Sequence, residues 1–249
     1  MRNILLTIKY LGTAYSGWQV QANAPSVQQT LQDAVEKLFG VRESVVGCSR
    51  TDAGVHANMY CCNVRTSSAL PCDVVVRGLN AHLPDDIAVL SCRDVDYDFH
   101  ARYDCCGKEY IYIIHNSHIR DPFLLGRSWD FKKHIDAEYL NKQAQSFVGT
   151  HDFKAFCASG SSVQSTVRTV KSFRVTRDGE NVIMSVKADG FLYNMVRIMV
   201  GTLTDITLGR IKPDTIPEII ASCERKNAGV TAPPQGLYLN RVYYSGEEL

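Results

Sequence analysis

The chain has 249 residues, of which 45% are hydrophobic and 21% charged, and its formal net charge is +1. This length and composition exclude a miniature scaffold and a largely disordered chain, because enough apolar surface is present for a substantial core. The near-neutral charge neither supports nor excludes a nucleic-acid partner, which is usually signalled by a strongly basic face. No apolar stretch reaches membrane-spanning length and no signal segment precedes the first predicted strand, so we expect a cytoplasmic protein without membrane contact.

The first half of the chain begins with a strand and a well-marked helix. Residues 3–10 alternate between apolar and mixed side chains, which is typical of a strand with one buried face. Ser26 stands three residues before Gln29, the spacing of a capping box, and the helical stripe that follows ends at Gly40. Further strands are predicted at 44–48, 59–64 and 87–95, with a helix at 73–82.

The second half repeats this order of elements. A predicted hairpin is joined through Asp178-Gly179, a strong turn signal. The predicted elements are a strand at 108–115, a helix at 136–148 closed by Gly149, hairpin arms at 169–176 and 181–188, an apolar helix at 191–208, a shorter helix after Asp214 and a last strand at 237–244.

This order of elements predicts an α+β fold. We expect two similar halves that form a largely antiparallel mixed central sheet, with helices packed on one face. The predicted halves are 1–104 and 105–249. A doubly wound nucleotide fold is not expected, because no Gly-rich phosphate loop follows a strand.

The nine cysteines do not form a metal-binding or redox pattern. Their number is odd and no two have the C-x-x-C spacing. We therefore expect reduced thiols, several of them small apolar fillers, and no metal site.

The segment 49–57 places an acid, a base, a hydroxyl and a glycine between two predicted strands. A loop in this position can present Asp52 to a ligand. Composition alone favours a purely structural turn, in which Asp52 bonds its own backbone and Gly54 supplies a positive φ. It leaves the functional interpretation open.

Arg197 is the only charged residue in the stretch 191–200. A buried guanidinium is costly unless it is paired, so a carboxylate partner is expected. A cation beside an aspartate would also keep that aspartate ionised, as a carboxylate nucleophile requires. Arg197 could instead extend to a surface.

Several motifs together resemble the TruA family of tRNA pseudouridine synthases, which act as tRNA pseudouridine(38-40) synthases. The resemblance covers nearly the whole chain. It rests on the motifs at 50–57, 99–102, 108–112 and 195–197, supported by those at 17–19, 26–28, 151–153 and 236–239. It implies the pseudouridine synthase fold, with the catalytic cleft between the two halves.

The resemblance also implies roles for four residues. Asp52 matches the catalytic aspartate, and Tyr110 matches the tyrosine that packs on the target base. Arg197 matches the basic residue that pairs with the aspartate, and Arg50 matches an arginine thought to hold RNA and assist base flipping. The sequence departs from the family pattern at Ser49, at Leu11 and at Tyr193-Asn194, which bears on RNA specificity more than on activity.

The chemistry implied by the family needs no cofactor, because the product is an isomer of the substrate. A carboxylate can attack ribose C1′, as glycosidase carboxylates do, or remove a proton from C2′. The sequence does not distinguish these routes. Tyr110 offers a flat face for the displaced base and a hydroxyl near C5.

The resemblance implies a tRNA partner and a homodimer. The expected targets are positions 38 to 40 of the anticodon stem-loop, with one tRNA touching both subunits. A two-fold dimer could assemble a basic cleft that the net charge does not reveal. Candidate backbone contacts are Arg50, Arg65, Arg77, Arg102, Lys108 and Lys154.

Three alternatives to this activity are open. The protein could perform the same chemistry on a different RNA, or it could be a non-catalytic RNA-binding paralogue that kept the fold. A carboxylate hydrolase acting on nucleosides is a third alternative, but it would normally need a second acidic group, and the motif loop holds none.

Overall fold

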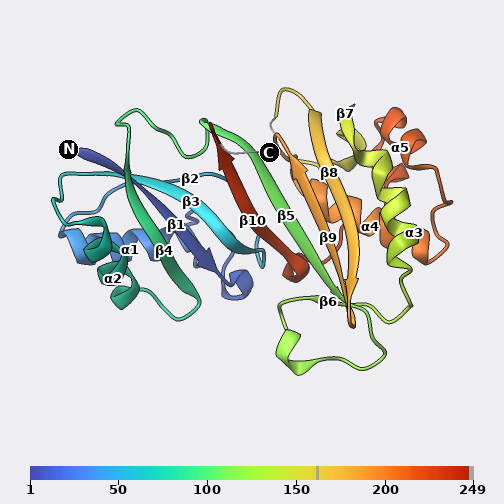
Figure 1. Cartoon of the computed structure of the whole chain (residues 1–249), viewed down its shortest axis with the longest axis horizontal. Helices are drawn as coiled ribbons and strands as arrows, with labels where there is room; N and C mark the ends of the chain where they lie inside the picture. The colour runs from blue at the N-terminus through green and yellow to red at the C-terminus, as the bar shows by residue number, and fades with distance from the viewer. Residues whose placement is uncertain (161–162, 247–249) are drawn as a thin grey trace. The chain divides into compact units, whose positions relative to one another are not determined.

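The computed structural model describes residues 1–160 and 163–246, and these form two compact units (Figure 1). Among the described residues, the first unit contains Met1–Cys106 together with 238–246, and the second contains Gly107–Leu237. The division therefore differs from the expected halves in the last strand. That strand joins the first unit, where its residues Tyr238 and Leu239 pair in parallel with the strand that follows the Asp52 loop.

The first unit is a mainly antiparallel sheet with two helices. The strand order is β4-β1-β3-β10, and β2 also pairs with β3. The helices α1 and α2 pack against one another, and α2 also packs against β4. Its strands are β1 (Arg2–Tyr10), β2 (Val45–Gly47), β3 (His56–Thr66), β4 (Ile87–Val95) and β10 (Leu237–Tyr244), and its helices are α1 (Val27–Phe39) and α2 (Cys72–His82).

The alternation in β1 has the expected physical cause. Ile4, Leu6 and Ile8 are fully buried and lie on one face of the strand, whereas Lys9 on the opposite face is exposed. Successive side chains of a strand point to opposite faces, so one face of β1 supplies core residues. The predicted strand is confirmed, and it starts one residue earlier than expected.

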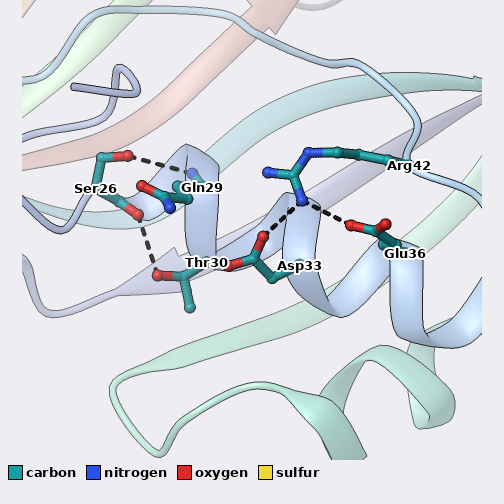
Figure 2. Close-up of polar contacts among 6 residues, drawn as sticks. All are labelled: Ser26, Gln29, Thr30, Asp33, Glu36 and Arg42. Atoms are coloured by element: carbon teal, nitrogen blue, oxygen red, sulfur yellow. Dashed lines mark hydrogen bonds and ion pairs between the residues drawn. The ribbon is translucent and has the colours of Figure 1, made fainter. Parts of the chain in front are cut away.

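Helix α1 begins and ends at the signals read from the sequence, and Figure 2 shows the contacts at its start. The Ser26 hydroxyl accepts a hydrogen bond from the Gln29 backbone N–H at 3.3 Å, and the Thr30 hydroxyl donates to the Ser26 carbonyl at 3.1 Å. Gly40 ends the helix in the left-handed region, at φ 75°. These are the usual devices for satisfying backbone groups at helix termini.

Arg42 binds back to α1 just after the helix ends. Its guanidinium contacts the carboxylates of Asp33 at 2.8 Å and Glu36 at 2.7 Å (Figure 2). All three side chains are exposed, so solvent screens the pairs. These ion pairs hold the segment that leads from α1 to β2 against the helix.

The second unit is also a mainly antiparallel sheet with helices. Its strand order is β5-β9-β8-β7, and β6 pairs in parallel with the end of β5. Helix α3 packs against β8. The strands are β5 (Cys105–His115), β6 (Trp129–Asp130), β7 (Gly149–Asp152), β8 (Val167–Asp178) and β9 (Asn181–Ala188), and the helices are α3 (Ala137–Ala144), α4 (Met195–Thr207) and α5 (Ile216–Ser222).

The predicted hairpin is confirmed as β8 and β9, but its two loop residues are Gly179 and Glu180, and Asp178 is the last residue of β8. Asp178 pairs with Asn181, so the loop contains two residues, and Gly179 takes a positive φ of 56°. The helix predicted at 136–148 is shorter than expected. It is α helical over Ala137–Ala144, continues as a 3-10 turn and is followed by Gly149 at φ 118°.

None of the nine cysteines is joined in a disulfide in the structure. Within residues 1–160 and 163–246, no three His, Cys, Asp or Glu side chains gather in a group that could hold a metal ion. The same part of the chain contains no helix that is both long and apolar enough to cross a bilayer.

Candidate active site

Asp52 lies on a tight turn between β2 and β3. The Val55 N–H donates to the Asp52 carbonyl at 3.2 Å, and Gly54 adopts φ 76°. Thr51 is buried, and its hydroxyl hydrogen-bonds the Tyr10 hydroxyl at 2.7 Å. Asp52 itself is half-buried. The turn and the positive φ of Gly54 that were expected from the sequence are therefore present, and Asp52 lies within this turn.

The segment Gly12–Trp18 holds the Asp52 turn by close backbone contact. The Trp18 N–H donates to the Thr51 carbonyl at 3.1 Å. A Cβ at Gly17, which has φ 98°, would lie 2.5 Å from that same carbonyl, and one at Gly12 would overlap the Val55 carbonyl. Glycine is required at both positions because the backbones approach so closely. The loop is thus locked from one side.

Aromatic packing anchors this segment. The Trp18 ring stacks on Tyr60 with centroids 4.1 Å apart, and both side chains are buried. His56, at the start of β3, is fully buried and accepts a hydrogen bond from the Gly12 N–H through Nδ1 at 2.9 Å. Because Nδ1 accepts, a neutral His56 carries its proton on Nε2. Sequence reasoning assigned no role to Trp18 or His56.

The motif at 99–102 is held by buried amide side chains. The Asn63 Oδ1 on β3 accepts from the Ala101 N–H at 2.9 Å, and its Nδ2 donates to Asn3 at 3.0 Å. The Tyr244 hydroxyl donates to the Ala101 carbonyl at 2.9 Å. Arg102 follows directly and is exposed. The motif is therefore a fixed loop that presents a cation.

Tyr110 lies on β5 in the second unit. Its side chain is 7% exposed, and its ring packs edge-on against Phe191 with centroids 5.0 Å apart. Tyr112, two residues further along β5, shares its face and donates from its hydroxyl to the Pro233 carbonyl at 2.7 Å. Burial raises the pKa of Tyr112 above its ordinary value, and the nearby charge of Arg197 opposes that shift.

Arg197 lies in the first turn of α4 and is half-buried. Its Nε donates to the Ala232 carbonyl at 2.7 Å, and its Nη1 donates to Asn194 Oδ1 at 2.7 Å. The helix predicted at 191–208 begins at Met195. It starts later because Asn194 has φ 59°, outside the right-handed helical region.

The start of α4 is electropositive. A helix N-terminus carries a partial positive charge, and a cation there is unfavourable unless an anion lies nearby. The first turn of α4 contains Arg197 and no acidic residue. A carboxylate or phosphate close to the first turn of α4 would therefore be stabilised by both the helix terminus and Arg197.

A strap at 228–232 is fastened to α4. The Gly229 N–H donates to the Thr202 hydroxyl at 2.9 Å, and the Val230 N–H donates to the Asp205 carboxylate at 3.0 Å. The strap comes so close that a Cβ at Gly201 would overlap the Val230 carbonyl. Since Ala232 belongs to this strap, the packing fixes the carbonyl that holds Arg197.

We expect Gly201→Ala to destabilise the protein by several kcal/mol, as overpacking of a rigid backbone contact does. Glycine to alanine inside a helix normally stabilises by about 0.5–1 kcal/mol, so the contact with Val230 reverses the sign. Gly78→Ala in α2 is the matched control, because its Cβ would meet the methyl ends of the Leu38 side chain, which can move. Chemical denaturation of both variants provides the measurement, and equal effects would contradict the prediction.

The four predicted site residues are distributed over both units. Arg50 and Asp52 lie on the motif loop of the first unit, with Arg50 exposed. Tyr110 and Arg197 belong to the second unit. Within that unit, the Tyr110 ring contacts Phe191, and the charge of Arg197 acts on Tyr112, two residues further along β5.

Comparison with known proteins identifies the family. A sequence model described as tRNA pseudouridine synthase matches residues 6–104 and 143–245. Proteins named tRNA pseudouridine synthase A match nearly the full chain. That of Acetivibrio thermocellus is 47% identical, that of Thermoanaerobacter sp. strain X514 is 45% identical and that of Clostridium kluyveri is 44% identical, and each alignment covers 98% of this chain and 100% of the relative.

These matches define the chain as an RNA-modifying isomerase of the pseudouridine synthase class. It belongs to the tRNA pseudouridine synthase A (TruA) family, so the resemblance read from the motifs is confirmed.

Proposed function

We propose that this protein converts uridine to pseudouridine in the anticodon stem-loop of tRNA, at positions 38 to 40, with the Asp52 carboxylate acting on the ribose. The observation that carries the proposal is the geometry of the motif loop. A half-buried carboxylate stands on a turn that is locked by buried contacts at Thr51 and by the glycines at positions 12 and 17. Such a loop is a preorganised site and not a flexible connection.

The reaction breaks the bond from uracil N1 to ribose C1′, turns the base and joins C5 to C1′. Atoms and electrons are conserved within the nucleotide, so the reaction consumes no second substrate. Asp52 serves either by forming a bond to C1′ as the bond to N1 breaks, a bond that C5 later displaces, or by taking the C2′ proton as the bond to N1 breaks and later returning it. C5 loses one proton and N1 gains one, and we propose that the Tyr110 hydroxyl oxygen accepts the C5 proton as its own proton passes on toward N1.

We propose that Arg197 keeps Asp52 ionised during this reaction. The support is electrostatic, since a cation at a helix N-terminus without an acid in the first turn favours a carboxylate close by. The proposed role for Tyr110 is to pack on the displaced base. Its edge-on contact with Phe191 holds the ring on one face of β5.

Exposed cations are proposed to hold the tRNA backbone and offset the cost of extracting the target nucleotide. Arg50 and Arg102 are exposed next to fixed loops, and the Arg65 guanidinium lies 5.0 Å from the centroid of the Tyr97 ring. Arg77 is already paired with Asp73 at 2.9 Å, which makes it the weaker candidate. The remaining candidates are Lys108 and Lys154.

Incubation of the purified protein with tRNA transcripts, followed by pseudouridine mapping at nucleotide resolution, tests the proposal. New pseudouridine confined to positions 38 to 40 is the expected result. Pseudouridine at another position, or only in another RNA, would contradict the proposed substrate and support the proposed reaction. Tight binding without product under single-turnover conditions would identify a non-catalytic RNA-binding protein.

We further propose that the protein is cytoplasmic and works as a homodimer that binds one tRNA across both subunits. A two-fold assembly would bring two sets of these cations together. Light scattering combined with size-exclusion chromatography should give the mass of two chains. A single-chain mass with full activity would contradict this.

Activity should not depend on a metal ion or an organic cofactor held by the protein. The proposed chemistry assigns the reacting groups to Asp52 and Tyr110, so dialysis against a chelator should leave the rate on pre-folded tRNA unchanged. The assay contains no added divalent cation after folding, which separates effects on RNA structure from effects on the protein. Loss of activity that zinc restores would contradict the expectation.

A further inference from the structure

Asn194 stands at the N-cap of α4 but does not cap the helix. Asparagine at this position normally accepts a hydrogen bond from a backbone N–H of the first turn. Here its side chain makes no capping bond, and Oδ1 accepts from the Arg197 guanidinium at 2.7 Å. The helix therefore lacks a favourable cap, and the acceptor serves Arg197 instead.

The backbone at Asn194 explains this change of partner. Its φ of 59° and ψ of 9° lie in the left-handed region, whereas a capping residue is normally extended. Hydrogen bonds on both sides hold the turn, from the Ala158 N–H to the Tyr193 carbonyl at 3.0 Å and from the Ile198 N–H to the Asn194 carbonyl at 3.0 Å. Apart from glycine, asparagine and aspartate tolerate this conformation best.

Two bonds from different nitrogens fix the plane of the Arg197 guanidinium. Ala232 accepts from Nε, and Asn194 accepts from Nη1. A single bond would allow the planar group to turn about it, but two acceptors on separate segments do not. An arginine fixed in this way loses little further freedom when it meets an anion.

The Asn194 side chain is uncharged, so it can orient Arg197 without neutralising its positive charge. An aspartate at 194 would tolerate the same backbone conformation and could accept the same bond. Its charge would neutralise Arg197 and compete with any other anion for the guanidinium. Asparagine combines tolerance of the left-handed region, an acceptor and zero charge at this position.

We propose that Asn194 is a positioning residue for the isomerisation, which fixes the orientation of the Arg197 guanidinium without neutralising it. This inference rests on the proposed function of Arg197. Asn194 is not expected to touch the substrate.

Two variants separate the features of Asn194. Asn194→Gly keeps the left-handed backbone and removes the acceptor, so the thermal midpoint should stay close to wild type. Its kcat should fall about tenfold, with KM for tRNA nearly unchanged, as expected when an interaction acts only in the transition state. Asn194→Asp keeps the acceptor and adds a charge. It should move the acidic limb of the pH–rate profile to higher pH, because a neutralised Arg197 no longer favours an ionised Asp52.

Cys223→Gly is the matched control. Cys223 also has a positive φ, of 53°, and ends α5. Glycine there changes the same backbone property without touching Arg197, so kcat and the pH profile should remain those of the wild type. A fall in kcat equal to that of Asn194→Gly would overturn the proposal, since the effect would then be a general one of backbone flexibility.

The positioning role also has a readout that does not depend on activity. Hydrogen exchange at the Arg197 Nη1–H, which donates to Asn194 Oδ1, should be slow in the wild type and in Asn194→Asp, and fast in Asn194→Gly when it is followed by nuclear magnetic resonance. Wild-type exchange and wild-type kcat in Asn194→Gly would overturn the proposal. Protein that forms no pseudouridine but shows this exchange pattern would refute the proposed function and leave the positioning of Arg197 standing.

Discussion

Replacing Asp52 with asparagine should lower turnover about a thousandfold or more, while the fold and tRNA affinity stay near wild type. A factor of a thousand corresponds to about 4 kcal/mol of barrier, which is reasonable for removal of the group that reacts with the ribose. The amide keeps the shape of the side chain and loses the nucleophilic or basic oxygen. The turn should persist, because the hydrogen bond from Val55 uses the backbone carbonyl of residue 52.

Single-turnover kinetics on a tRNA transcript give the rate, and filter binding gives the affinity. Asp33→Asn is the matched control, since that carboxylate lies on α1 and is exposed apart from its pair with Arg42. The control should retain wild-type turnover. An Asp52→Asn rate within a factor of about ten of wild type would rule out Asp52 as the reacting group.

Replacing Arg197 with methionine should reduce the rate and shift its pH dependence. If Arg197 keeps Asp52 ionised, its loss raises the pKa of that carboxyl group, so the inactive protonated form persists to higher pH. The acidic limb of the profile then moves upward. Arg197→Lys should be milder, because the charge returns, but one ammonium cannot reproduce the two bonds to Ala232 and Asn194.

The pH shift separates this effect from lost stability. Methionine leaves the acceptors on Ala232 and Asn194 without their donors, which costs about 1–3 kcal/mol for each acceptor that stays buried. That cost lowers the thermal midpoint without moving the profile. A profile that is scaled down but not shifted would contradict the pairing with Asp52 and indicate that Arg197 binds an RNA phosphate.

Elements with strong local periodicity were predictable from the sequence. β4 and β10 have the predicted bounds, and β1 differs by one residue, because alternation and turn residues act over a few neighbours. β6 and β7 were not predicted, since strands of two and four residues are too short to show a period. The start of α4 was missed because a left-handed residue leaves no sign in the apolar pattern.

The candidate site was predictable only in part, for a similar reason. Asp52 could be singled out because it lies in a loop between two strands, and Arg197 because it is the only charge in an apolar stretch. Tyr110 was assigned through the family resemblance alone. Ala232 and Tyr112 gave no signal. Ala232 acts through its backbone carbonyl, and the Tyr112 hydroxyl meets a carbonyl of residue 233, far along the chain. No spacing rule encodes such partners.

The place of β10 has a consequence for how the protein is made. β10 adds to β3 beside the Asp52 loop, yet it is synthesised after the second unit. On the ribosome, the first unit therefore stays incomplete, with an unpaired strand edge at His56 and Ala57, until the second unit has been translated. A nascent or truncated chain that lacks β10 exposes the start of β3 to other strands, and a nonsense mutation just before β10 damages the first unit, although the other strands of that unit were made earlier.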